Sequence, residues 1–157
     1  MKIHLIMVGK TTDPNVKALI DDYSSRLKHY APFEAEVIPE LKNAKSLTEA
    51  QQKTKEGELI LKTLKPTDQV YLLDEGGREY RSVEFARFIG QSQQTVAQRM
   101  VFIIGGPYGF SGEVYAAAKG KVSLSKMTFS HQMVRAFFVE QLYRAMTILR
   151  GEPYHHE

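Results

Sequence analysis

The stretch RMVFIIGGPYGF, residues 99–110, decides the fold class of this chain. Its first half is almost entirely apolar and lacks the alternation of a strand that has one face in water. Such continuous apolar strands are typical of parallel sheets that are covered by helices on both faces. The glycines that follow end the strand and open a loop.

Strand and helix patterns alternate on both sides of this stretch. The other predicted strands cover residues 2–9, 33–40, 69–77 and 121–124, and the predicted helices cover 13–30, 46–64, 82–96, 111–119 and about 130–149. This alternation predicts an α/β protein with a mainly parallel sheet and helices on both faces. The length of 157 residues fits a single domain, residues 1–157.

The predicted helices begin at recognisable signals. Pro14 opens the first helix, and Ser46 with Glu49 three residues later has the spacing of a capping box. Ser82 and Ser130 are placed to cap the third and the last helix.

Composition and charge exclude several classes of protein. The absence of cysteine excludes disulfides, thiolate metal sites and cysteine nucleophiles. The first apolar run is too short for a signal peptide, and no run reaches the length of a membrane helix, so we expect a cytoplasmic protein. Residues 79–157 hold nine Lys or Arg against six Asp or Glu and so carry the whole net charge of +3. This basic half fits a nucleic-acid partner or, equally, a solvated surface.

Three loops follow strands and are candidates for ligand binding, because ligands of parallel sheets bind at the carboxyl ends of the strands. They are LLDEGGRE at 72–79, IIGGPYGFSG at 103–112 and LSKMTFSH at 124–131. The glycine loop has neither the dinucleotide nor the Walker A spacing. It allows close approach of a ligand to the backbone, or it is a turn with positive φ at Gly106 and Gly109.

The other two loops also allow more than one interpretation. Asp74 and Glu75 can bind a ribose hydroxyl or act as a general base, although the glycines after them favour a simple turn. In the loop 124–129, backbone groups cannot all be paired by regular structure and are available to a ligand. Lys126 can contact phosphate. Met127 and Phe129 can pack on an aromatic ring, and Ser125 or Thr128 can hydrogen-bond to a polar edge.

The last helix is apolar on nearly every side, whereas a surface helix usually buries one stripe. We therefore expect its second face to be buried in the core or in a homodimer. Arg144 lies one turn after Glu140 and can form an ion pair with it, whereas Arg135 has no acid at helical spacing and is the stronger candidate to face a ligand. The tail is by default disordered, although Tyr154 can stack on a base and His155 can shuttle a proton.

The order of motifs along the whole chain resembles the RlmH family, bacterial methyltransferases that modify N3 of a pseudouridine in large-subunit ribosomal RNA. The motifs are VGK, LLDEGG, FIIGGPYG, VSLSKMTFSHQMVR, EQLYRA and RGEPYHHE. The resemblance implies a SPOUT-type methyltransferase with a C-terminal trefoil knot, acting as a homodimer. It also implies a target in helix 69 of 23S ribosomal RNA on assembled 70S ribosomes, which agrees with a net charge too small for tight binding of naked RNA.

The resemblance implies S-adenosylmethionine as cofactor and no metal. The matching cofactor positions are Leu73, Gly105, Leu124, Ser125, Lys126, Met127, Thr128 and Phe129. A nearby cation or a base would favour the N3 anion, and the candidates are His131, which can instead complete the helix cap, and Arg135, Tyr154 and His155. Candidates for RNA contact are Lys126, Arg135, Arg144, Tyr154 and His155.

Two alternative functions come from other classes of protein. A non-catalytic ribosome-binding factor would share the basic C-terminal region without needing a cofactor loop. A flavodoxin-like enzyme would share the strand and helix alternation, but it should bind a phosphate-bearing ligand at its first loop, where VGKTTDP is only faintly suggestive.

Overall fold

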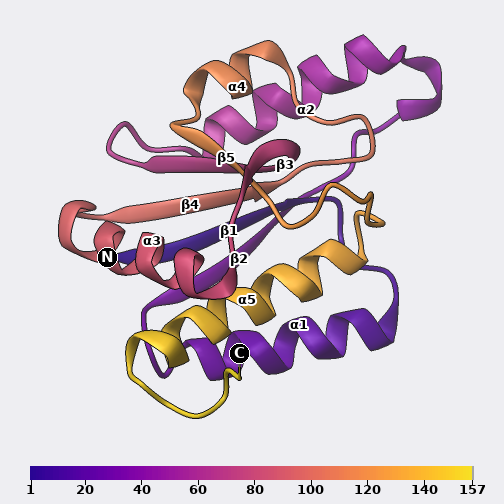
Figure 1. Ribbon diagram of the computed structural model, residues 1–157. Helices are drawn as coiled ribbons and strands as arrows, with labels where there is room; N and C mark the ends of the chain where they lie inside the picture. The colour runs from indigo at the N-terminus through magenta and orange to yellow at the C-terminus, as the bar shows by residue number, and fades with distance from the viewer. Residues whose placement is uncertain (157) are drawn as a thin grey trace.

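The computed structural model describes residues 1–156 and contains one parallel sheet of five strands in that range. The strands are β1 (Lys2–Val8), β2 (Phe33–Ile38), β3 (Gln69–Glu79), β4 (Arg99–Ile104) and β5 (Gly120–Ser123). Their order across the sheet is β2-β1-β4-β3-β5, and every pair is parallel (Figure 1). The expected fold class and all five expected strands are confirmed.

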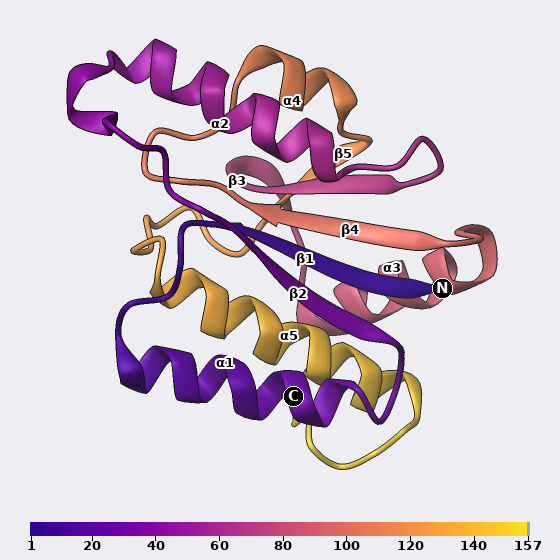
Figure 2. The same ribbon diagram turned by 180° about the vertical axis from the view of Figure 1, so that it is seen from behind.

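Helices cover both faces of this sheet, as Figures 1 and 2 show. One face carries α1 (Pro14–Leu27), α3 (Ser82–Thr95) and α5 (Met133–Leu149); the other carries α2 (Glu49–Thr63) and α4 (Gly112–Ala117), with a short 3-10 turn, η1 (Ala44–Ser46), before α2. Each face has its own apolar core, and all six residues of β4 are buried. Within residues 1–156, no helix is long and apolar enough to cross a membrane.

The helix starts agree in part with the capping signals. Pro14 is the first residue of α1, as expected, and Asp13 caps it. The predicted capping box of α2 is wrong, because Ser46 belongs to η1 and the box is formed by Thr48 with Gln51. Arg81 rather than Ser82 precedes α3.

The start of the last helix lies three residues later than expected. Regular α5 begins at Met133, after a turn formed by residues 131 and 132. Ser130 nevertheless does what its position predicts, since its Oγ accepts a hydrogen bond from the backbone N–H of Met133 at 3.0 Å.

The LDEGG segment is not a simple turn, which corrects the expectation for residues 73–77. It lies inside β3, where Val122 aligns with Leu73 and again with Arg78, so that residues 74–77 bulge out of the ladder. An ideal Cβ on Gly77 would lie 2.7 Å from the backbone carbon of Lys121. The backbones of β3 and β5 therefore cross at a distance that only glycine allows. Figure 1 shows this part of β3 as a curl that leaves the sheet and descends towards α3. The trefoil knot implied by the resemblance stays a prediction.

Candidate functional site

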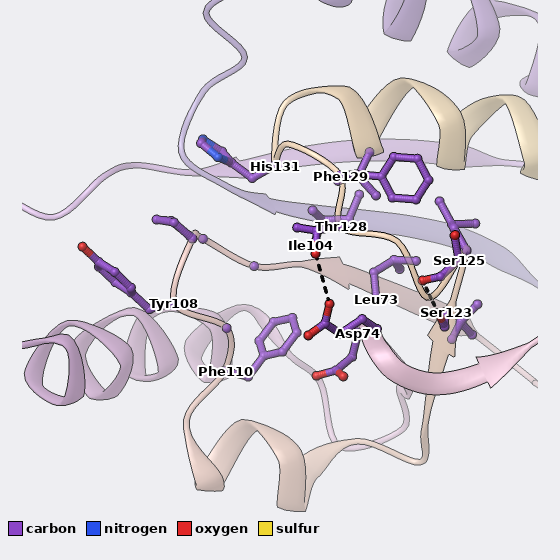
Figure 3. A pocket seen from close by; sticks show the side chains of 18 of the residues that line it. Leu73, Asp74, Ile104, Tyr108, Phe110, Ser123, Ser125, Thr128, Phe129 and His131 are labelled. Atoms are coloured by element: carbon purple, nitrogen blue, oxygen red, sulfur yellow. Dashed lines mark hydrogen bonds between the residues drawn. The ribbon is translucent and has the colours of Figure 1, made fainter.

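A cavity of about 510 Å³ lies at the carboxyl ends of β3, β4 and β5. All three loops selected from the sequence contribute to it, so their predicted convergence at one edge of the sheet is confirmed. Figure 3 shows the pocket with Tyr108 and His131 towards one side and Ser123 and Ser125 towards the other. Eight cofactor or catalytic candidates implied by the resemblance line it: Leu73, Gly105, Leu124, Ser125, Met127, Thr128, Phe129 and His131.

The sequence did not single out several other side chains of this pocket. Ile104 ends β4, Phe110 lies near the end of the glycine loop, Tyr115 lies in α4, and Val134 lies in the first turn of α5. Their only signal was position, since each lies within a few residues of a loop at the carboxyl edge of the sheet.

The glycine loop forms one wall. An ideal Cβ on Gly105 would lie 2.9 Å from the ring of Phe110, so this backbone needs glycine for close packing. Gly109 has a φ of +80°, as expected for the turn. Gly106 does not have a positive φ, which corrects that expectation. It lies instead against α2, where an ideal Cβ would come 3.0 Å from Oε1 of Glu56, a carboxyl whose pKa burial raises.

The loop 125–129 offers its backbone to a ligand. In the described part of the chain, none of its residues makes a backbone-to-backbone hydrogen bond. Side chains hold it in shape: the Ser123 hydroxyl donates to the carbonyl of Ser125 at 2.9 Å, and Ser125 Oγ accepts from the N–H of Met127 at 3.0 Å. Amides and carbonyls left in this way are suited to the polar edge of a heteroaromatic ring.

Asp74 and Glu75 make the charged side of the pocket. Asp74 accepts hydrogen bonds from the N–H of Gly76 at 2.8 Å and from the Tyr115 hydroxyl, and burial together with this bond raises the pKa of Tyr115 to about 12. Glu75 Oε2 lies 3.5 Å from the hydroxyl of Thr128 across the pocket. No lysine or arginine lines this pocket, and residues 1–156 contain no cluster of three metal-ligating side chains.

Lys126 is the one residue of the loop 124–129 that does not line the pocket. Its side chain is 86% exposed and its Nζ lies 3.9 Å from Glu79. An outward lysine is suited to a phosphate, as expected for this side chain. The expected contact of Lys126 with the cofactor stays a prediction.

Arg135 does not face the pocket, which corrects the expectation of a ligand-facing arginine. It has 0% exposure, and its guanidinium donates to the carbonyls of His131 and Val8 and to the hydroxyl of Thr11. The Arg135 side chain points into the protein towards the end of β1. It therefore has no need of an acid at helical spacing on the helix surface.

The described part of the C-terminal tail packs on α1 and α5, away from the pocket of the same chain. Tyr154 donates to Glu140 at 2.9 Å, and Arg144 pairs with Glu140 at 2.6 Å, as its spacing predicts. Arg144 also contacts His155 Nδ1 at 3.1 Å and lies over the ring of Tyr154. Burial and two hydrogen bonds raise the pKa of Tyr154. The default of a disordered tail is therefore wrong.

A parallel sheet with a pocket at its carboxyl edge agrees with the class of protein that comparison of the sequence identifies, the SPOUT methyltransferases. The chain matches, over residues 1–155, a family model whose description is "Predicted SPOUT methyltransferase". The fold is similar to the crystal structure of a probable methyltransferase from Bordetella pertussis Tohama I, with a TM-score of 0.57 and 12% identity over 92% of this chain and 96% of that chain. At this identity the likeness concerns the fold alone.

Two relatives identify the family to which the chain belongs within this class of methyltransferases. The chain is 63% identical to a protein of Bacteroides fragilis and 60% identical to one of Parabacteroides distasonis, each named "Ribosomal RNA large subunit methyltransferase H", over 157 residues and 100% of both chains in each comparison. The chain thus belongs to the SPOUT methyltransferases and, among them, to the RlmH family.

Proposed function

We propose that this protein transfers a methyl group from S-adenosylmethionine to N3 of a pseudouridine in helix 69 of 23S ribosomal RNA. The substrate is the assembled 70S ribosome in the cytoplasm, because a net charge of +3 favours recognition of a formed surface over binding to naked RNA. Membership of the RlmH family and the names of its relatives support this assignment.

The charge of the pocket is the observation that carries the proposal. Among residues 1–156, its lining contains two carboxylates, Asp74 and Glu75, and neither lysine nor arginine. Phosphate-bearing ligands such as ATP or FMN would be repelled, since their sites provide cations or converging backbone amides. A sulfonium ligand is a cation and is attracted. This electrostatic character opposes the flavodoxin-like alternative.

The residues present fit the cofactor in shape as well. A cavity of about 510 Å³ is within the range of small-molecule sites. Leu73, Leu124 and Phe129 provide apolar walls for the adenine, and the loop 125–129 provides free backbone groups for its polar edge. When bound, S-adenosylmethionine supplies an electrophilic methyl carbon that bonds to N3 as the carbon–sulfur bond breaks, leaving neutral S-adenosylhomocysteine.

His131 is our candidate for the group that accepts the N3 proton. It lines the pocket and its side chain is exposed at the pocket's edge, where a base of the RNA can reach it. A neutral imidazole nitrogen can accept this proton and pass it on to solvent. Its neighbours in the turn, Ser130 and Gln132, fix the backbone on which it lies.

We further propose a homodimer in which the tail completes the partner's site. Tyr154 and His155 lie outside the pocket of their own chain, so a role in the reaction requires a second copy. Met133 and Phe137 leave an apolar face of α5 exposed at 40% and 46%. A second α5 would bury this face. Arg144, beside the tail, and the outward Lys126 would contact RNA phosphates.

Methyl transfer to ribosomes tests the proposed function. Purified protein is incubated with labelled S-adenosylmethionine and with 70S ribosomes lacking the modification, free subunits or naked RNA. Label confined to 70S ribosomes, with a reverse-transcription stop at one pseudouridine of helix 69, is the expected result. Calorimetry with S-adenosylmethionine, ATP and FMN runs beside it. Cofactor binding without transfer would overturn the substrate, and absence of cofactor binding would favour a non-catalytic ribosome-binding factor.

A further inference from the structure

Arg135 occupies a position that local physical chemistry disfavours. It is fully buried in the first turn of α5, where the helix dipole repels a cation. No carboxylate lies within ion-pair distance of it in residues 1–156, and burial lowers the pKa of its guanidinium against a weaker opposing effect of Glu40. A buried cation without an anion is costly. Breaches of local rules tend to mark positions with a functional role.

The hydrogen bonds of Arg135 join two segments far apart in the sequence. Nη2 donates to the carbonyl of Val8 at 2.8 Å, Nη1 to Thr11 Oγ1 at 2.9 Å, and Nε to the carbonyl of His131 at 3.0 Å. Val8 is the last residue of β1 and is 5% exposed. One side chain thus ties the end of β1 to the end of the loop 124–131, here called the pocket loop.

Gln132 makes a second connection between the same segments. Its Oε1 accepts from the N–H of Thr12 at 2.8 Å, and its Nε2 donates to the carbonyl of Lys10 at 3.3 Å. The loop between β1 and α1 is therefore bound to the residues just after the pocket loop by both side chains.

The pocket loop depends on its two ends. At one end, Ser123 belongs to β5 and pairs with β3. Between the ends, residues 125–129 make no backbone-to-backbone hydrogen bond within residues 1–156. At the other end, the loop reaches His131, whose carbonyl accepts from Arg135. The shape of this part of the pocket is set by how firmly the second end is held.

We infer that Arg135 and Gln132 are positioning residues, which hold the loop 124–131 in its ligand-binding shape by tying it to residues 8–12. They act through the loop and do not touch the ligand. The inference rests on the proposed function in one respect, that the ligand of the pocket is S-adenosylmethionine.

Thr11 provides a matched test, because it lies outside the pocket and accepts from Arg135 through its hydroxyl. Thr11→Val removes the acceptor at nearly constant shape, and Thr11→Ser keeps it. We expect Thr11→Val to weaken S-adenosylmethionine binding about tenfold, the effect of losing one hydrogen bond to a charged donor. Thr11→Ser should stay within about twofold of the wild type. Arg135→Lys should act like Thr11→Val or more strongly.

Trypsin cleavage after Lys126 gives a readout that needs no ligand, because this lysine is 86% exposed in the middle of the loop. Cleavage after Lys126, measured relative to cleavage after the exposed Lys42, should be faster in Thr11→Val and unchanged in Thr11→Ser. A merely structural role would lower the melting temperature of Thr11→Val without changing this ratio or the affinity at 25 °C, and that result would overturn the inference. Absence of S-adenosylmethionine binding in the wild type would instead overturn the proposed function, and the cleavage ratio would still decide whether the positioning role holds.

Discussion

At Gly77 the backbones of β3 and β5 come so close that one added carbon atom would collide with β5. Gly77 leaves no room for a methyl group, because the atoms nearest to an ideal Cβ are backbone atoms of Lys121 and Val122, which cannot turn away as a side chain can. We expect Gly77→Ala to lower the free energy of unfolding by about 3 kcal/mol, as overpacking in a well-packed region does. Urea unfolding followed by circular dichroism measures this.

Gly112→Ala is the control for Gly77, because within residues 1–156 no atom beyond its chain neighbours and its own helix backbone lies within 4 Å of an ideal Cβ at this first position of α4. It should be neutral or stabilise the protein by up to about 1 kcal/mol, since alanine is the better helix former. Equal effects of the two substitutions would contradict the close crossing.

The carboxylate of Glu75 should distinguish the cationic donor from its neutral product. We expect Glu75→Gln to lower the preference for S-adenosylmethionine over S-adenosylhomocysteine roughly three- to tenfold, the effect of one opposite charge at a partly solvated site. Calorimetry with both ligands measures the ratio. Glu79→Gln is the control, because Glu79 is on the same strand and outside the pocket. An unchanged ratio in Glu75→Gln would show that the charge of Glu75 does not determine the preference between the two ligands.

At the scale of elements, the tail and α5 form one unit through the Tyr154 hydroxyl. Tyr154→Phe removes its hydrogen bond to Glu140 and should cost about 1 kcal/mol of unfolding free energy at pH 8. The folded pKa of Tyr154 is raised, so above pH 10 the unfolded chain loses its proton first and stability falls as pH rises. The difference between wild type and Tyr154→Phe should therefore shrink above pH 10. Chemical unfolding at pH 8 and pH 11 checks this, and a difference that grows with pH would contradict the hydrogen bond.

Regular elements were the part of this protein that the sequence predicted well. Apolar periodicity located the five strands and five α-helices because burial on the sheet is a local, repeating requirement. Convergence of the three loops followed from the parallel sheet. The crossing at Gly77, the inward turn of Arg135 and the packing of the tail depend on contacts between distant segments, such as Arg135 with Val8, and no local pattern encodes them.

At the scale of the whole molecule, the residues of one chain form the pocket, and the tail of that chain lies away from it. If the proposed dimer forms through the exposed face of α5, Phe137→Asp should produce a monomer, because a carboxylate cannot be buried there without a partner. Sedimentation velocity measures the association state. The monomer should bind S-adenosylmethionine and fail to methylate ribosomes. Full transfer by a monomer would contradict the shared site.

The crossing of β3 over β5 also has a consequence for biosynthesis. Residues 120–135 are translated after the first four strands, and the walls of the pocket come from both parts. Domains begin to order from the N-terminus while synthesis continues. The pocket is therefore among the last features to form, and on the proposed function an unfinished chain could not methylate the ribosome that is making it.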